Sequence, residues 1–93
     1  MLKTFGSRPS LGMLSFPRAG ATLALDFPDE GSRTLRLFAE LDAVVRETNG
    51  AIYPAKDARM PGNLFRAGYP AWRTFAEHID PRFSSSFWRR VTE

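Results

Sequence analysis

Four residues suited to chemistry lie close together in the middle of the chain: Tyr53, Lys56, Asp57 and Arg59. They place a phenol, an ammonium, a carboxylate and a guanidinium within one short segment. An ammonium held beside a bound molecule can stabilise negative charge that develops during a reaction, and fixed charge of this kind is a strong catalytic factor. The same lysine can instead be a surface residue paired with Asp57 or Asp26, which contributes little to stability. The spacing alone favours this surface pair.

Asp57 and Arg59 are better suited to a structural role than to catalysis. An arginine and a carboxylate form strong and geometrically specific hydrogen bonds, which can hold a loop in register. We therefore expect these two side chains to brace the loop that carries Lys56. Tyr53 ends the segment before this loop, and its position alone predicts an aromatic residue of the core or rim with its hydroxyl in water.

The element expected to position this loop is an amphipathic helix that starts at Ser32. Ser32 is a suitable N-cap residue, and Asn49-Gly50 is typical of a left-handed helix end. The apolar side chains between them recur at helical spacing and predict one buried face. They are Leu37, Phe38, Leu41, Val44 and Val45.

Two short strands are predicted on either side of this helix. Residues 21–27 carry almost continuous apolar side chains, which suits a strand covered on both faces. Residues 51–53 form the second predicted strand, shortly before Lys56. A strand–helix–strand unit gives either adjacent parallel strands or a split arrangement with another strand between them, and the sequence leaves both open.

The rest of the chain is predicted as loop and short helices. Residues 1–20 are rich in Gly, Pro and Ser and indicate a lead-in loop with one extended piece at residues 13–16. Three helical segments follow: 61–69, 70–79 and, as a last turn or short helix, 83–91. The order loop–strand–helix–strand–helix–helix predicts an α+β fold in which residues 21–93 form a single partial domain.

The composition excludes several classes of site. The chain has no cysteine, which rules out disulfides, iron–sulfur clusters and thiolate zinc sites. His78 is the only histidine, so we expect no metal site. No apolar run approaches the ~20 residues that span a bilayer, and the N-terminus lacks the apolar stretch of a signal peptide. We therefore expect a cytoplasmic protein with no membrane span.

The charge is positive but dispersed. The net charge is +3 at pH 7 and the pI is about 10.0, yet the basic residues do not form the concentrated patch that is usual in nucleic-acid-binding proteins. The segment best suited to contact nucleic acid is Trp88-Arg89-Arg90, and a solvated helix face accounts for it more simply. We therefore expect no nucleic-acid partner.

Several separate motifs resemble the C-terminal end, the substrate or cap domain, of FAD-linked oxidases of the vanillyl-alcohol-oxidase type. The resemblance covers residues 12–93, with its motifs in the right order along the chain. They are the run from Thr22 to Pro28, Tyr53-Pro54-Ala55-Lys56-Asp57, the run from Phe65 to Pro70, and Asp80-Pro81 with Phe83. The chain is similar in particular to decaprenylphosphoryl-β-D-ribose oxidase-like and sugar/aldonolactone oxidase-like proteins.

The resemblance implies roles for four positions. The family's lysine at the position of Lys56 faces flavin and substrate, which implies a catalytic and cofactor-binding residue. The tyrosine at the position of Tyr53 lies beside the flavin, which implies cofactor binding. Thr22 and Ala24 match substrate-binding positions, where the polyprenyl-sugar oxidases carry Asn and Cys. This departure removes an amide and a thiol, and so argues against the same substrate.

The resemblance also implies a function that needs a further domain. Oxidases of this type bind FAD mainly through an N-terminal domain, none of which is present in this sequence. We therefore expect a C-terminal fragment or subunit of an FAD-dependent oxidoreductase acting on a sugar or alditol CH–OH group, inactive until it joins an FAD-binding domain or subunit. The alternative is a stand-alone interaction module or a remnant without catalysis, which self-associates into a homo-oligomer.

Overall fold

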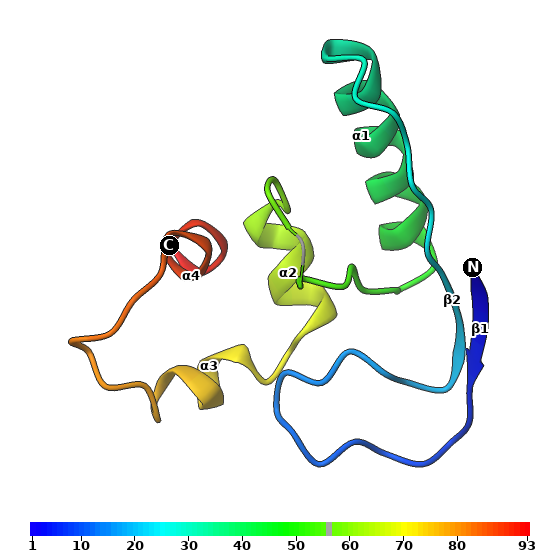
Figure 1. Cartoon of the computed structure of the whole chain (residues 1–93). Helices are drawn as coiled ribbons and strands as arrows, with labels where there is room; N and C mark the ends of the chain where they lie inside the picture. The colour runs from blue at the N-terminus through cyan, green and yellow to red at the C-terminus, as the bar shows by residue number, and fades with distance from the viewer. Residues whose placement is uncertain (56) are drawn as a thin grey trace.

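The fold combines one small sheet with a series of helices (Figure 1). The computed structural model describes residues 1–55 and 57–93. In this part of the chain two strands are followed by four helices. They are β1 (Leu2–Phe5), β2 (Gly20–Leu23), α1 (Ser32–Glu47), α2 (Gly62–Gly68), α3 (Trp72–Ala76) and α4 (Ser86–Thr92). The predicted α+β class is confirmed.

The sheet pairs β1 with β2 in antiparallel register, with Leu2 opposite Leu23. Two further backbone hydrogen bonds, of 2.8 and 2.9 Å, join Met1 to Ala24. The expectation that residues 1–20 hold no strand other than an extended piece at 13–16 was wrong, because β1 is stabilised by a partner far along the chain. β2 is also shorter than the predicted strand, and Leu23 is 60% exposed, so it is not covered on both faces.

The predicted strand at residues 51–53 does not form, and the strand–helix–strand unit was therefore wrong. These residues have no regular secondary structure. The carbonyl oxygen of Ile52 accepts a hydrogen bond of 2.7 Å from the hydroxyl of Tyr69 in place of a strand partner. An apolar run of three residues becomes a strand only where a neighbouring strand offers its backbone groups.

Helix α1 has the predicted extent but a different beginning. Its N-cap is Gly31, with φ +67°, and no side chain caps it. The turn before it is held instead by Thr34, whose Oγ1 accepts from the backbone N–H of Glu30 and donates to the carbonyl of Pro28. The expectation that Ser32 is the N-cap was wrong. The predicted end is confirmed, because Asn49 adopts a φ of 54°, the left-handed conformation that terminates helices.

The fully buried apolar side chains all lie in the C-terminal half of the chain, and Leu14 and Phe16 pack against them from the N-terminal half. The fully buried side chains, which are no more than 2% exposed, are Met60, Leu64, Phe65, Tyr69 and Val91. In residues 1–55 the buried side chains are the polar Thr34 and Asp42. The helices α2, α3 and α4 therefore gather around a core of their own, whereas α1 stands beside the sheet (Figure 1).

Glycines at both ends of α2 allow its backbone to pack closely against neighbouring segments. A Cβ on Gly62 would lie 3.1 Å from the carbonyl oxygen of Val91 in α4. A Cβ on Gly68 would lie 2.9 Å from the Cβ of Ala51, closer than such atoms approach in real structures. Helix α2 is thus fixed between α4 and the segment at Ala51 that leads into the lysine loop (residues 54–60), of which the structure describes residues 54–55 and 57–60.

Among residues 1–55 and 57–93, no helix combines the length and the apolar character that crossing a bilayer requires.

We expect Gly68→Ala to lower the free energy of unfolding by about 1–3 kcal/mol, because the added methyl group overlaps with Ala51. The loss should occur although alanine is the better helix former by about 1 kcal/mol. Urea denaturation followed by circular dichroism measures it. The double variant Gly68→Ala with Ala51→Gly removes the contacted Cβ and should recover most of the stability. A Gly68→Ala protein as stable as the wild type would contradict this close approach.

Candidate functional site

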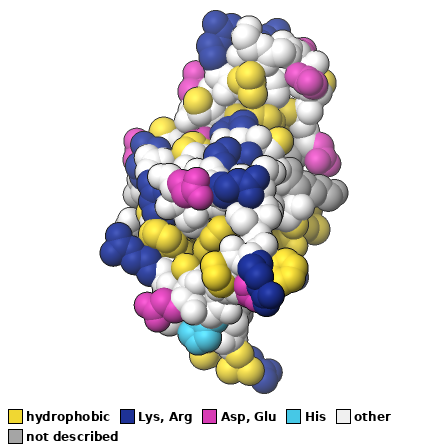
Figure 2. Space-filling view, turned by 90° about the vertical axis from the view of Figure 1, so that its left-hand side faces the viewer, with side chains coloured by type: hydrophobic (Ala, Val, Ile, Leu, Met, Phe, Trp, Pro, Cys, Tyr) yellow, Lys and Arg dark blue, Asp and Glu magenta, His cyan; other side chains and the backbone are white. Residues whose placement is uncertain are grey.

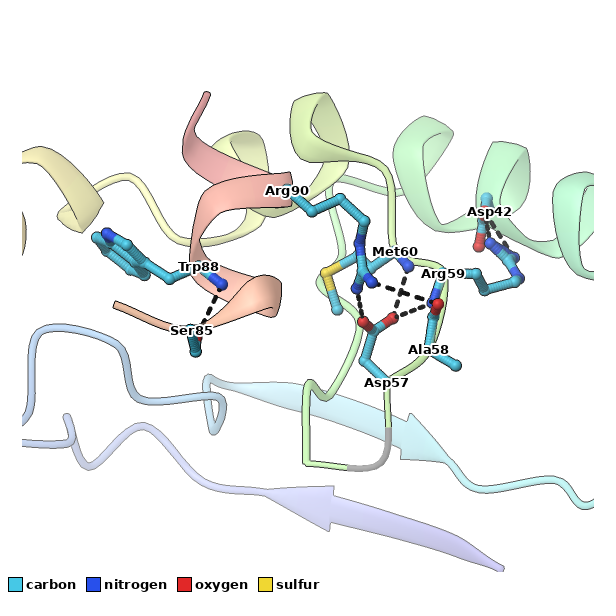
Figure 3. A network of polar contacts seen from close by, with 8 residues as sticks. All are labelled: Asp42, Asp57, Ala58, Arg59, Met60, Ser85, Trp88 and Arg90. Atoms are coloured by element: carbon cyan, nitrogen blue, oxygen red, sulfur yellow. Dashed lines mark hydrogen bonds and ion pairs between the residues drawn. The ribbon is translucent and has the colours of Figure 1, made fainter. Parts of the chain in front are cut away.

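The predicted catalytic residue, Lys56, lies outside the described residues. The structure does describe the segments on either side of it. The segment that follows, residues 57–60, is held by side chains from two helices that are far apart in the sequence (Figure 3). The site can therefore be built from the contacts that fix the lysine loop.

Asp57 is the centre of these contacts. Its side chain is 5% exposed. One carboxylate oxygen, Oδ1, accepts from the backbone N–H groups of Arg59 at 3.1 Å and Met60 at 2.5 Å. The other oxygen forms an ion pair with the guanidinium of Arg90 in α4, which also donates to the carbonyl of Ala58 at 3.3 Å. Asp57 thus ties the backbone of its own loop to the C-terminal helix.

Arg59 ties the same loop to α1. Its Nη1 and Nη2 donate to Oδ2 of Asp42 at 2.8 and 2.7 Å. The guanidinium also lies over the ring of Phe38, 5.2 Å from its centroid, a cation–π contact. Burial raises the pKa of the Asp42 carboxyl above its ordinary value, and the attraction of Arg59 and Arg46 offsets this only in part. Because Asp42 is 7% exposed, its charge needs the arginine as a partner.

The predicted bracing role of Asp57 and Arg59 is confirmed, but both partners were missed. Each forms an arginine–carboxylate hydrogen bond. The partners Asp42 and Arg90 are 17 and 33 residues away in the sequence. Asp42 could have been found, since it is a carboxylate at helical spacing from Phe38, on the apolar side of α1. No signal in the sequence singles out Arg90, which was interpreted as part of a solvated helix face.

In the segment before Lys56, the backbone of Ile52 is held by a hydrogen bond, whereas the side chain of Tyr53 is exposed. Tyr69, which is 2% exposed, donates its hydroxyl hydrogen to the Ile52 carbonyl. Its burial raises the pKa of the phenol to about 12. The side chain of Tyr53 is 62% exposed, and its ring packs against Phe16 with 5.2 Å between centroids. A predicted cofactor-binding residue therefore presents most of its ring and hydroxyl to the outside.

The two predicted substrate-binding residues occupy different surroundings. Thr22 is half-buried and lines an apolar groove of about 640 Å³ between the β2 segment and α1. Ala24 is exposed, and its backbone pairs with Met1 at the end of the sheet. Of the described residues predicted for the site, only Thr22 lines this groove. The structure brings Asp42 and Arg90 to the lysine loop but does not gather Thr22, Ala24 and Tyr53 in one pocket.

Charged side chains of both signs are spread over the surface of the described residues. On the face that carries α3 and α4, basic and acidic side chains are interspersed with apolar ones (Figure 2). In the described ranges no three carboxylate, histidine or cysteine side chains gather to hold a metal ion. The two buried carboxylates, Asp57 and Asp42, are paired with arginines in the contacts that fix the described part of the lysine loop. The other two ion pairs among the described residues, Arg33 with Glu30 and Arg82 with Asp80, lie at the surface.

Comparison with known proteins finds relatives that are much longer than this chain. An uncharacterised protein from the mprA 5′ region of Streptomyces coelicolor is 36% identical over 96 residues, which cover 98% of this chain and 26% of that protein. Decaprenylphosphoryl-β-D-ribose oxidase of Mycolicibacterium smegmatis is 36% identical over 83 residues, which cover 84% of this chain and 18% of the oxidase. This chain therefore spans about a quarter and about a fifth of their lengths. It is similar to a part of an oxidase.

No family model matches the chain, and no solved structure matches it either.

We expect Asp57→Ala to lower the free energy of unfolding by about 2–4 kcal/mol, because it leaves two backbone N–H groups and a guanidinium without their acceptor. Arg90→Ala should lower the free energy of unfolding by less, because the Arg90 side chain is partly exposed. The loss in the double variant should be smaller than the sum of the two single losses, because the two residues contact each other. Urea denaturation measures all three. The control is Arg82→Ala, whose ion pair with Asp80 is exposed, and its midpoint should not change. An equal lack of effect for Asp57→Ala would disprove the bracing role.

We expect the stability of the chain to decline between pH 10 and about 12, because the pKa of Tyr69 lies above its ordinary value of 10.0. The folded chain keeps the phenol proton where the unfolded chain loses it, so this contribution is fully present below pH 10 and is lost as pH rises through about 12. Tyr69→Phe should cost about 1 kcal/mol at neutral pH and flatten the decline. Urea denaturation across this range, with Tyr53→Phe as the matched control, tests it. A decline that persists unchanged in Tyr69→Phe counts against this assignment.

Proposed function

We propose that this chain is a C-terminal fragment or subunit of an FAD-dependent oxidoreductase that acts on the CH–OH group of a sugar or alditol. The observation that carries the proposal is the similarity of 84% of the chain to part of decaprenylphosphoryl-β-D-ribose oxidase. That similarity agrees with motifs spread along the chain, among them the Tyr-Pro-Ala-Lys-Asp segment at residues 53–57. In this role the chain contributes the cap that faces flavin and substrate.

The described residues could contact one edge of a flavin ring but could not hold the whole of FAD. Tyr53 offers an exposed phenol beside the ring of Phe16, which is suited to line the side of a flat ring system. No Gly-rich loop for the pyrophosphate occurs in the sequence. FAD would therefore be held mainly by a partner domain or subunit, and we expect none to bind to this chain alone.

A bound FAD would supply the acceptor for the hydride of the alcohol carbon, and the hydroxyl proton would pass to water as the carbonyl forms. Lys56 has the role of holding positive charge where negative charge develops during this transfer, which lowers the barrier. In the complete assembly Tyr53 would line the pocket and Thr22 and Ala24 would contact the substrate, although in this chain the three do not share one pocket. Asp57 and Arg59 fix the backbone directly after Lys56, and such support by surrounding hydrogen bonds is what a catalytic side chain requires.

A second candidate function is a stand-alone module that self-associates without catalysis. The exposed apolar groove between the β2 segment and α1 favours it, because an uncovered apolar surface drives association. This module would form a dimer that depends on concentration and would carry no flavin.

We expect the tagged chain, recovered from its native lysate, to bring down a stoichiometric FAD protein with yellow flavin absorbance. In that complex Lys56→Ala should reduce turnover of a sugar or alditol by about 100-fold, because fixed charge at the reacting centre is lost, without releasing the partner. The matched control is Lys3→Ala, which removes the other lysine and should leave turnover unchanged. A colourless eluate that contains only the chain itself would support the self-associating module instead.

A further inference from the structure

The chain exposes more surface than a compact protein of its size. Its accessible surface is 7297 Å², whereas a folded monomer of 10.5 kDa exposes about 5,400 Å². Its radius of gyration is 14.4 Å, against about 12 Å for a compact domain of this length. The excess of about 1,900 Å² is comparable to what one partner buries in an obligate interface.

Part of this exposed surface is apolar and lies beside α1. In residues 1–55 no apolar side chain is buried, and α1 stands apart from the other helices, with the extended chain after β2 running along it (Figure 1). Leu23 at the end of β2 is 60% exposed, Leu25 on the extended chain is 54% exposed, and Val44 on the helix is 54% exposed. These side chains line the same apolar groove of about 640 Å³, together with Phe27, Phe38 and Leu41.

The groove offers mainly apolar contact. Among the described residues that line it, Arg18 is the one charged side chain. Its guanidinium donates to the carbonyl of Gly68 at 2.5 Å, a neutral acceptor that leaves the positive charge in place. Away from Arg18, an ionised group would lose its hydration without gaining a charged partner. The surface therefore favours an apolar segment.

We infer that this groove is the docking surface for the larger polypeptide that the proposed function requires, the FAD-binding domain or subunit, which inserts an apolar segment between β2 and α1. The inference rests on the proposed function and adds to it the place of contact and its chemistry. The relatives support this occupant, because about three-quarters of one and about four-fifths of the other lie outside the part that this chain matches.

A second copy of the chain is a poorer occupant for a physical reason. A symmetric dimer presents the same patch from both partners, and two concave grooves facing each other would leave the apolar side chains of both without contact. Close packing at the centre of an interface requires a protruding segment against a hollow one. A larger partner can supply that segment.

The test uses the full chain and, as a probe, the Mycolicibacterium smegmatis oxidase from which the segment matched by this chain has been deleted. The two are co-expressed and their affinity is measured by titration. Val44→Asp and Leu25→Asp each place a carboxylate in the groove, and each should weaken binding by about 100-fold, because the charge is buried without a partner. Leu35→Asp is the matched control. Leu35 is 57% exposed on the same helix, half a turn from Val44 in angle, and does not line the groove. It should bind as the wild type does.

Circular dichroism establishes that all three variants keep the helical content of the wild type, which is expected because each altered side chain is more than half exposed. Failure of the wild type to bind the probe, or equal binding by Val44→Asp and Leu35→Asp, would overturn the inference. So would a homodimer of the chain alone, seen by sedimentation, that Val44→Asp dissociates and Leu35→Asp does not. A complex that forms through the groove but oxidises no sugar or alditol would sustain the inference while refuting the proposed function.

Discussion

The buried carboxylate of Asp57 is the contact on which the arrangement around the lysine loop depends. It has almost no access to water, and its charge is balanced by two backbone N–H groups of its own loop and by the guanidinium of Arg90. Removing any one of these donors leaves the buried carboxylate with fewer partners and lowers stability. The loop and the C-terminal helix therefore have one relative arrangement in which the carboxylate is satisfied. Met60, whose backbone N–H donates to the Asp57 carboxylate, places its side chain in the core.

The second ion pair extends this constraint across the two halves of the molecule. Arg59 reaches Asp42 on α1, although the core itself lies around α2 and α4. The guanidinium of Arg59 also lies over the ring of Phe38 on the same helix. Hydrogen bonds from Tyr69 to Ile52 and from Arg18 to Gly68 also join the two halves. Directional polar contacts, rather than a shared apolar core, thus set the position of α1 in the described structure. A low effective dielectric around the half-buried pair strengthens this link.

The uneven core has a direct consequence for function. The C-terminal half buries its apolar side chains as a folded domain does, while the N-terminal half leaves a helix face and an extended segment uncovered. A chain that was only a fixed cap would not need this surface, and a chain that acted alone would lose stability by exposing it. Both features fit the proposal that the chain is part of a larger assembly. In that assembly, contacts within this chain hold residues 57–60, and the partner covers the groove.

The sequence by itself determined the elements whose signals are local. Helix α1 and its end at Asn49 follow from side-chain spacing and from one residue's tolerance of the left-handed conformation, and the α+β class and the bracing residues Asp57 and Arg59 were also predictable. Tertiary structure decided what depends on distant partners. Strand β1 exists because β2 pairs with it, residues 51–53 are not a strand because buried Tyr69 takes the Ile52 carbonyl, and the arginine–carboxylate pairs join residues 17 and 33 positions apart. Hydrogen bonds of this kind are selected by three-dimensional proximity, which side-chain spacing along a single segment does not encode.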